Sequence, residues 1–325
     1  MRIDRYDPSC AKTWDAFVRA SRNGTFLMTR PYMDYHADRF ADCSLIVRDP
    51  EGEVVALIPA HAEGSALVSH GGLSYGGFVI GSGMKLPLML RVFESVLLFL
   101  CEQGFEVLNY KTIPHIYHQQ PSEEDRYALF LLGAERIRTD LLSVVSGESR
   151  LPYQTRRTRG IKRARSAGVT VTEEIDYAQF WDLLTASLAD RFHATPVHSL
   201  AEIRLLQERF PANIRLFVAR AHVGELLAGV VIYQSERVAH AQYIASSPAG
   251  RDLAALDLVF DHLLNDVFKD HPYFDFGGSH EERGRTVNLG LIEQKEGFGA
   301  RAVAHDHYRI DLTKIRPGVL TGALK

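Results

Sequence analysis

Cysteine is scarce in this sequence, and nothing in its spacing suggests pairing. The 325 residues contain Cys10, Cys43 and Cys101, with no CxxC spacing among them. Three thiols cannot all form disulfides with one another, and small secreted domains built on disulfides carry many more cysteines. We therefore expect reduced thiols, which are typical of a cytoplasmic protein.

The sequence also lacks an export leader and a long apolar run. No basic stretch followed by an apolar one opens the chain, so we do not expect export. The most apolar segment, residues 86–100, is interrupted by Arg91 and Glu94. It is shorter than the roughly 20 residues that cross a bilayer. It predicts a buried helix, in a cytoplasmic protein without a transmembrane segment.

The sequence also has no strong excess of positive or negative charge. The formal net charge is −3, with 24% charged and 46% hydrophobic residues, so the overall composition does not predict DNA binding. Residues 151–168 are a local exception, since they contain a run of six cationic residues. The run consists of Arg156, Arg157, Arg159, Lys162, Arg163 and Arg165. A chain of this length predicts two domains, and this shift in composition predicts a boundary near residue 150.

Both halves repeat one order of secondary structure: strand, turn, strand, further strand, glycine-bearing loop, helix, strand. In the first half, these predicted elements cover residues 44–48, 54–62, 66–69, 78–80, 86–103 and 106–113. In the second half, they cover residues 214–221, 226–234, 238–245, 253–267 and 273–276. The repeat predicts two tandem α/β (α+β) domains with mixed sheets.

The order in the second half is that of an acetyltransferase (GNAT) core. In that fold, the loop after the central strand wraps a coenzyme A pyrophosphate at a helix N-terminus, where backbone N–H groups and the helix dipole attract anions. Residues 247–254 hold this place, and Gly250 matches the pattern Q/R-x-x-G-x-G/A, whereas Ser247 and Asp252 do not. The fold predicts an acyl-CoA donor, most simply acetyl-CoA. Its predicted contacts are Ile244, Ala249, Gly250, Arg251 and Ala254.

Longer motifs resemble one branch of this superfamily. They are SHGGLSYGG at 69–77, NYKTIPHIYHQQPSEEDRYALF at 109–130, FDFGGSHEERG at 274–284 and NLGLIEQKEGFGA at 288–300, with residues 23–27, residues 30–33 and the Arg-rich linker. This ordered set is similar to bacterial GNAT proteins related to the Fem-type aminoacyltransferases. The resemblance implies tandem GNAT domains and N-acyl transfer. We expect an acceptor-side domain at 1–150 and a donor-side domain at 151–325, with the Arg-rich linker as a helix at its start.

The resemblance also suggests a nucleotide-linked or lipid-linked amino sugar of surface polysaccharide biosynthesis as the acceptor. Arginine's planar fork suits phosphate oxygens, and in Fem-type relatives the matching linker contributes to the nucleotide-sugar site. The predicted acceptor contacts are Arg30, His70, Tyr75, Lys111, Tyr117, Tyr153, Arg156, Arg157 and Tyr243. The alternative interpretation is structural: a solvated helix face for the arginines, and a glycine-rich turn around His70 and Tyr75.

Two segments offer candidate catalytic residues. The strand ending in FDFGGSHEERG presents His280 and Glu281 in a polar, glycine-hinged loop, where a base could deprotonate an amine. Lys295 precedes Phe-Gly, as a lysine does in the Fem-type family, where it faces the reaction centre. By that resemblance Lys295 would neutralise an oxyanion or a phosphate. An exposed polar loop and a surface lysine remain the plainer alternatives.

Other chemistries find less support in the sequence. There is no HExxH, no paired Cys/His spacing and no GxSxG elbow, so we expect neither a metal nor a serine nucleophile, although His305 and His307 share a strand face. Acetyl-CoA therefore leads as donor, and aminoacyl-tRNA is the runner-up, in which case tRNA would be a partner. A non-catalytic module that binds a sugar nucleotide is the third possibility.

Overall fold

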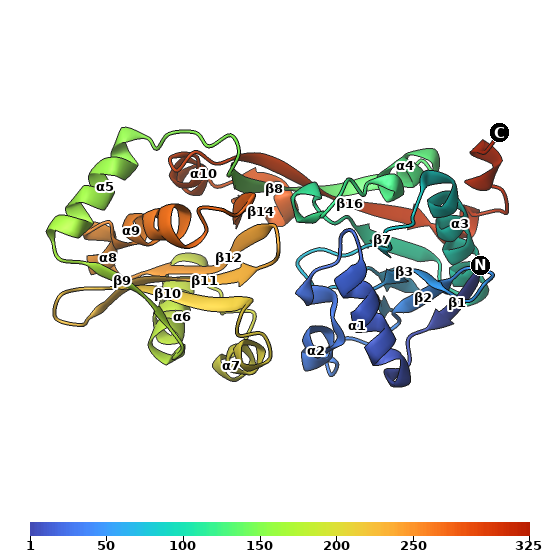
Figure 1. The fold of residues 1–325 in the computed structure, drawn as a ribbon, viewed down its shortest axis with the longest axis horizontal. Coiled ribbons are helices and arrows are strands. Elements are labelled where there is room, and N and C mark those ends of the chain that lie inside the picture. The colour runs from blue at the N-terminus through green and yellow to red at the C-terminus, as the bar shows by residue number, and fades with distance from the viewer. The chain divides into compact units, whose positions relative to one another are not determined.

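The computed structural model describes residues 1–325, including every side chain except those of Arg191, Phe192 and Arg283. The chain divides into two compact units (Figure 1). The first comprises Met1–Asp140 and Ala304–Lys325, and the second comprises Leu141–Val303. We expected one boundary near residue 150, with all later residues in the second domain. The structure instead places Ala304–Lys325 in the first unit. This placement follows from the antiparallel pairing of β16 (Arg301–Asp311) with β7 (Val107–Lys111).

An antiparallel sheet and a long apolar helix form the core of the first unit. The sheet has the order β1-β2-β3-β6, with bounds Arg2–Arg5, Leu45–Arg48, Val54–Ile58 and Val79–Ile80. Helix α3 (Leu86–Glu102) buries Met89, Phe93 and Val96 completely. Those side chains recur at intervals of three and four residues, so one face of the helix is apolar and packs into the core. The predicted helix over residues 86–103 is confirmed.

The first unit contains a second set of paired strands beside three shorter helices. The pairing runs β4 (His61–Glu63), β5 (Ala66–Val68), β7 and β16, with β5 parallel to β7. The helices are α1 (Ala11–Ala20), α2 (Arg30–Met33) and α4 (Glu124–Leu131).

The second unit is built on a mixed sheet. The end of β8 (Glu135–Ser146) pairs with β13, and the order continues β13-β12-β11-β10-β9. These strands span Tyr273–Gly278, Val238–Ser246, Leu226–Gln234, Ile214–Arg220 and Thr170–Glu174. All neighbours are antiparallel except β12 and β13, which are parallel. That parallel pair positions the candidate site.

Helices cover both faces of this sheet (Figure 1). Helix α6 (Ala178–Phe192) packs against β11 and β12, and α7 (Leu200–Arg209) contacts β10. Helix α9 (Ala255–His262) packs against β10 and β11. It also packs against α5 (Thr155–Ser166), the predicted linker helix. The remaining helices are α8 (Pro248–Asp252) and α10 (Leu289–Glu296).

The mixed α/β class predicted from the sequence is confirmed, and its strand pairs lie close to the expected bounds. The turn at residues 49–52 is closed by a 3.1 Å hydrogen bond from the Gly52 amide to the Asp49 carbonyl. Gly52 has a φ of +92°, which glycine adopts readily. Among the helices described, none combines the length and apolarity needed to cross a bilayer.

Candidate active site

A cavity opens in the second unit where β12 and β13 separate. Val238–His240 pair with Tyr273–Asp275, and no later pair joins these strands in the described part of the chain. Beyond that point lies a cavity of about 790 Å³. Its wall combines β12, the end of β13, the cationic side of α5, the end of α8, and residues of α6, α9 and α10. A separated parallel pair of this kind leaves backbone N–H and C=O groups facing the cavity, where a ligand can bind them.

A β-bulge in β12 decides which of its side chains face each side of the sheet. His240, Gln242, Ile244 and Ser246 all line the cavity, as do Ala241 and Ala245. The register shifts at Gln242, because Val231 pairs with Tyr243 whereas Ile232 pairs with Ala241. Gln242 is therefore the extra residue of a β-bulge at the cavity wall. The bulge puts His240 and Ile244 on opposite faces of the sheet, because their partners Tyr233 and Val230 are three residues apart on β11. The predicted donor contact of Ile244 stays a prediction.

His240 and Asp275 form the most ordered ionisable pair at the cavity. They are register partners at the last paired position of β12 and β13, and His240 Nδ1 lies 2.9 Å from Asp275 Oδ2. The carboxylate is 1% exposed, and its other oxygen accepts a 2.7 Å bond from the Gly277 amide. This contact fixes the imidazole so that Nδ1 donates its proton, which leaves Nε2 as the basic nitrogen.

Lys295, a predicted catalytic residue, also lines the cavity. Its ammonium donates to the carbonyls of Gly277 at 3.0 Å and Gly278 at 2.6 Å, both at the end of β13. Burial lowers the pKa of Lys295 to about 8, and the nearby Asp275 carboxylate partly opposes that decrease. The side chain is thus a buried cation close to the His240–Asp275 pair, and not the surface lysine of the plainer alternative.

The Arg-rich helix contributes to the cavity through some of its arginines. Arg156 and Arg163 on α5 are exposed and line the cavity, together with Arg251 on α8. Arg157 also lies at the wall, but it is 7% exposed and forms a buried ion pair with Asp257 on α9. The charge of Arg157 is thus balanced by Asp257, and its predicted contact with an acceptor phosphate stays a prediction.

In the predicted pyrophosphate loop, Gly250 makes close contacts within the protein. The Gly250 amide donates to the Ser247 hydroxyl at 3.0 Å, and a Cβ at Gly250 would lie 2.0 Å from the Leu227 carbonyl oxygen. Gly250 is thus required for close packing of α8 on β11, and not for approach to a ligand. Ala249 is exposed and does not line the cavity, whereas Arg251 and Ala254 do.

Two predicted tyrosines face elsewhere in the second unit. Tyr243 lies on the face of β12 opposite to Ile244, where its hydroxyl bonds to His198 Nδ1 and its ring packs edge-on against Trp181 of α6. The Tyr153 hydroxyl accepts bonds from Arg150 at 2.8 Å and Asn265 at 3.1 Å. Neither tyrosine lines the cavity, because strand alternation and these partners hold both rings away from it.

His280 and Glu281 lie just past β13, outside the cavity wall. Together they form β14 (His280–Glu281), which pairs with β15 (Thr286–Val287). The His280 ring lies against Gly278, and the exposed Glu281 accepts a 3.1 Å bond from Asn288. Neither residue is among those lining the cavity, so their predicted catalytic role stays a prediction.

In the first unit, the predicted acceptor contacts Arg30 and His70 are both buried. Arg30 is 5% exposed, forms ion pairs with Asp34 and Asp42, and lies 3.7 Å above the ring of Tyr6. Burial among other rings lowers the pKa of His70 to about 2. Arg30 therefore stabilises the packing of its own unit instead of presenting a free charge to a ligand.

The remaining first-unit candidates lie close to one another. The rings of Tyr75 and Tyr117 have centroids 4.3 Å apart and are both buried, with the Tyr75 hydroxyl 2.8 Å from that of Thr25. Lys111 donates to the Leu73 carbonyl, and burial lowers its pKa to about 8. These contacts provide a packing role for each residue, and their predicted acceptor contacts stay predictions.

The second unit is similar to proteins of known family and structure. Residues 153–283 match a family model described as an acetyltransferase (GNAT) domain. The solved structure of FemX is 12% identical and aligns over 94% of this chain and 97% of its own, with a TM-score of 0.66. L-PGS from Bacillus licheniformis is 13% identical over 98% of this chain and 94% of its own, with a TM-score of 0.60.

A third solved structure, a tandem GNAT protein from the clavulanic acid biosynthesis pathway, has a TM-score of 0.53. It is 11% identical and covers 96% of this chain and 98% of its own. A search of the curated proteins finds no match to the sequence. The chain has a Fem-like GNAT fold. The predicted pair of GNAT-type domains is confirmed, and the domain match supports an acyltransferase enzyme.

In GNAT terms, β12 and β13 are the central parallel strands that separate. Sequence reasoning placed Ile244 and Lys295 at this point but missed His240. Simple alternation over residues 238–246 could not have placed it, because the β-bulge at Gln242 puts His240 and Ile244 on opposite faces of the sheet. The pairing of His240 with Asp275 could not be found this way, since the strands' register depends on the tertiary fold.

Proposed function

We propose that the second unit transfers an acyl group from a phosphate-bearing carrier to an amine, with His240 as the general base. The observation that carries this proposal is the position of the His240–Asp275 pair at the point where β12 and β13 separate. Burial of Asp275 keeps the imidazole in one orientation. A base near neutral pH is what attack by an amine requires, because a protonated amine has no lone pair.

The transfer would proceed in one displacement. The amine nitrogen attacks the acyl carbonyl carbon, and His240 Nε2 accepts the proton that the nitrogen loses. Asp275 stabilises the resulting imidazolium through Nδ1. Backbone N–H groups along the unpaired edge of β12 and the Lys295 ammonium stabilise the tetrahedral oxyanion. Collapse of that intermediate expels the carrier thiolate or hydroxyl oxygen, which takes up a proton.

Acyl-CoA, in the simplest case acetyl-CoA, is the donor that the domain match favours. The volume of the cavity suits a pantetheine arm. Arg156, Arg163 and Arg251 line it and offer charge-assisted bonds to the phosphates. The acceptor that we propose is an amino sugar, nucleotide-linked or lipid-linked, of surface polysaccharide biosynthesis, on the strength of the motif resemblance.

Aminoacyl-tRNA is the second candidate donor, and one observation favours it. The Ser247 hydroxyl already binds the Gly250 amide, so the α8 loop has one N–H group fewer for a pyrophosphate. Exposed cations also continue along α5 beyond the cavity, at Arg159, Lys162 and Arg165. A nucleic acid needs such a run, since its affinity depends on neutralising many phosphates.

Isothermal titration separates the two donors. With acetyl-CoA, we expect Arg163→Glu to weaken binding by about tenfold or more, because each charge-assisted bond contributes about 1.5–3 kcal/mol. Arg159→Glu is the matched control on the same helix, outside the cavity, and should leave acetyl-CoA binding nearly unchanged. Charged tRNA would instead lose affinity with both variants. Failure of acetyl-CoA to bind the folded wild-type protein would reject the first donor.

Transfer kinetics test the base. His240→Gln should lower kcat by about 10²–10⁴, whereas the Kd of the donor should stay constant. The kcat is measured as the transfer of labelled acetyl groups to a panel of amino sugars. His222→Gln, an exposed histidine of the same unit, is the control and should match the wild type. Equal kcat values for both variants would remove His240 from the mechanism.

A further inference from the structure

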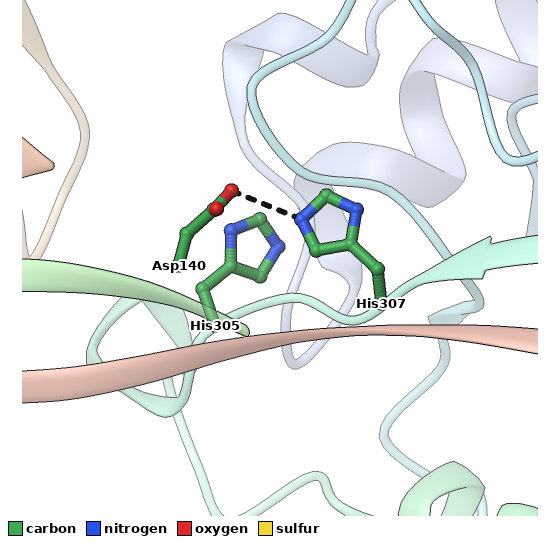
Figure 2. A group of neighbouring side chains, drawn as sticks. All are labelled: Asp140, His305 and His307. Carbon is green, nitrogen blue, oxygen red and sulfur yellow. Dashed lines mark hydrogen bonds and ion pairs between the residues drawn. The ribbon is translucent and has the colours of Figure 1, made fainter. Parts of the chain in front are cut away.

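A second group of ionisable side chains lies in the first unit, on β16 and β8. His305 and His307 are two residues apart on β16 and therefore project from the same face of the strand. Asp140 comes from the neighbouring strand β8. Figure 2 shows the carboxylate and the two imidazole rings turned toward one another. None of the three lines the cavity of the second unit.

The three side chains have the spacing of a ligand set. One nitrogen of each histidine and one carboxylate oxygen all lie within 4.8 Å of one another, and His305 and Asp140 are buried. His307 Nε2 is 3.1 Å from Asp140 Oδ2. Two ligands bound to one tetrahedral zinc at about 2.0–2.1 Å lie roughly 3.3 Å apart, so this pair could hold a cation with little movement.

A further contact prepares His305 as a ligand. Its Nε2 lies 2.8 Å from the carbonyl oxygen of Thr112 and donates to it. This bond fixes the tautomer and leaves a lone pair on Nδ1. Histidines that bind metals commonly donate their other N–H to a backbone carbonyl or a carboxylate in this way.

We propose that Asp140, His305 and His307 bind one divalent first-row transition metal, of which zinc is the probe. Two imidazole nitrogens and one carboxylate oxygen suit such metals, whereas calcium and magnesium prefer oxygen ligands alone. Water would complete the coordination. The cation would link β8 to β16 within the first unit. Its role would be to stabilise that unit, separately from acyl transfer.

Two cationic side chains lie next to the proposed ligands, one bound to Asp140 itself and one to a backbone carbonyl. Arg138 Nε donates to Asp140 Oδ1 at 2.5 Å, which leaves Oδ2 on the side of His307. Lys111, opposite His307 in the β7–β16 pairing, directs its ammonium to the Leu73 carbonyl. Their repulsion lowers the affinity for any cation, so the site should favour metals that bind imidazole strongly.

Metal titration of the untagged full chain, first stripped with a chelator, tests the proposal. We expect one Zn²⁺ per chain by isothermal titration, a rise in melting temperature, and the visible absorption of protein-bound Co²⁺ when cobalt is used. His307→Ala and Asp140→Ala should each raise the Kd by about 100-fold or more, because even outer-shell changes cost about 10–100-fold. His115→Ala, an exposed histidine of the same unit, should bind as the wild type does.

Circular dichroism of each metal-free variant establishes that it is folded. The proposal is overturned if the stripped wild type takes up no zinc or cobalt. It is also overturned if folded His307→Ala binds with the wild-type Kd, because the metal must then be held elsewhere.

Discussion

At the scale of single residues, Lys295 is the clearest case of a charge held in an apolar setting. Its pKa falls from 10.5 to about 8 because burial disfavours the ammonium. The unfolded chain has the ordinary pKa, so between about pH 8 and 10.5 it binds more protons than the folded protein does. Stability therefore rises with pH across that window, and the penalty is present in full below pH 8.

This difference predicts how a neutral replacement behaves. Relative to Lys295→Met, the wild type should gain about 3 kcal/mol of unfolding free energy between pH 7 and pH 11, since each pKa unit is worth about 1.4 kcal/mol. Denaturant unfolding at several pH values measures it. Lys162→Met, at an exposed lysine of the same unit, should show no such trend. A pH-independent difference for Lys295→Met would contradict the shifted pKa.

Single residues were also where sequence reasoning was least complete. Arg30 and Arg157 were predicted to bind ligands because arginine suits phosphate, yet both are buried beside aspartates. Asp257 lies 100 residues after Arg157 in the chain, and nothing in the local sequence links the two. Residue type indicates what a side chain can bind, whereas the partner it has is decided by packing.

At the scale of elements, that ion pair joins α5 to α9. Arg157→Met should lower the unfolding free energy by about 3–5 kcal/mol, because Asp257 would remain buried without its cation. The double variant Arg157→Met/Asp257→Leu should recover most of the loss, since no charge is then left unpaired. Thermal or denaturant unfolding of the two variants measures both effects.

A matched control comes from an exposed pair of the same unit. Arg204 and Asp176 are 2.8 Å apart with both side chains largely in solvent, and Arg204→Met should cost at most about 1 kcal/mol. A double variant at Arg157 and Asp257 no more stable than Arg157→Met would show that the helices depend on more than this charge balance.

Elements with a regular apolar pattern were predicted well, and those without one were not. Strands β10, β11 and β12 and helix α3 lie near their expected bounds, because burial on one or both faces leaves a clear periodicity. Strand β8 was missed, and of β16 only a strand face shared by His305 and His307 was expected. Their sequences, ERIRTDLLSVVS and RAVAHDHYRID, are rich in charge, and their pairing depends on contacts far along the chain.

At the scale of the whole molecule, the first unit depends on the last part of the chain. Strand β16 pairs with β7, and the Glu94 carboxylate accepts bonds from the amides of Gly318, Leu320 and Thr321. A chain ending at Val303 should therefore lose the first unit's cooperative fold. By hydrogen exchange, amides of β7 should lose protection while those of β11 and β12 keep theirs.

A chain ending at Ile315 provides the comparison, because it keeps β16 and removes only the partners of Glu94. It should retain protection in β7 with a lower melting temperature. Full protection of β7 in the shorter chain would mean that residues 1–140 form a stable unit without the C-terminal strand.

The divided first unit has a consequence for synthesis on the ribosome. Residues 1–140 emerge first but cannot complete their strand pairing until β16 follows, whereas the second unit is one continuous segment. At about 5–20 residues per second, the early residues wait roughly 10–40 s for their partner strand. The later unit is thus free to fold before the earlier one, and the nascent β7 edge is exposed to chaperones, or to other nascent chains, for that interval.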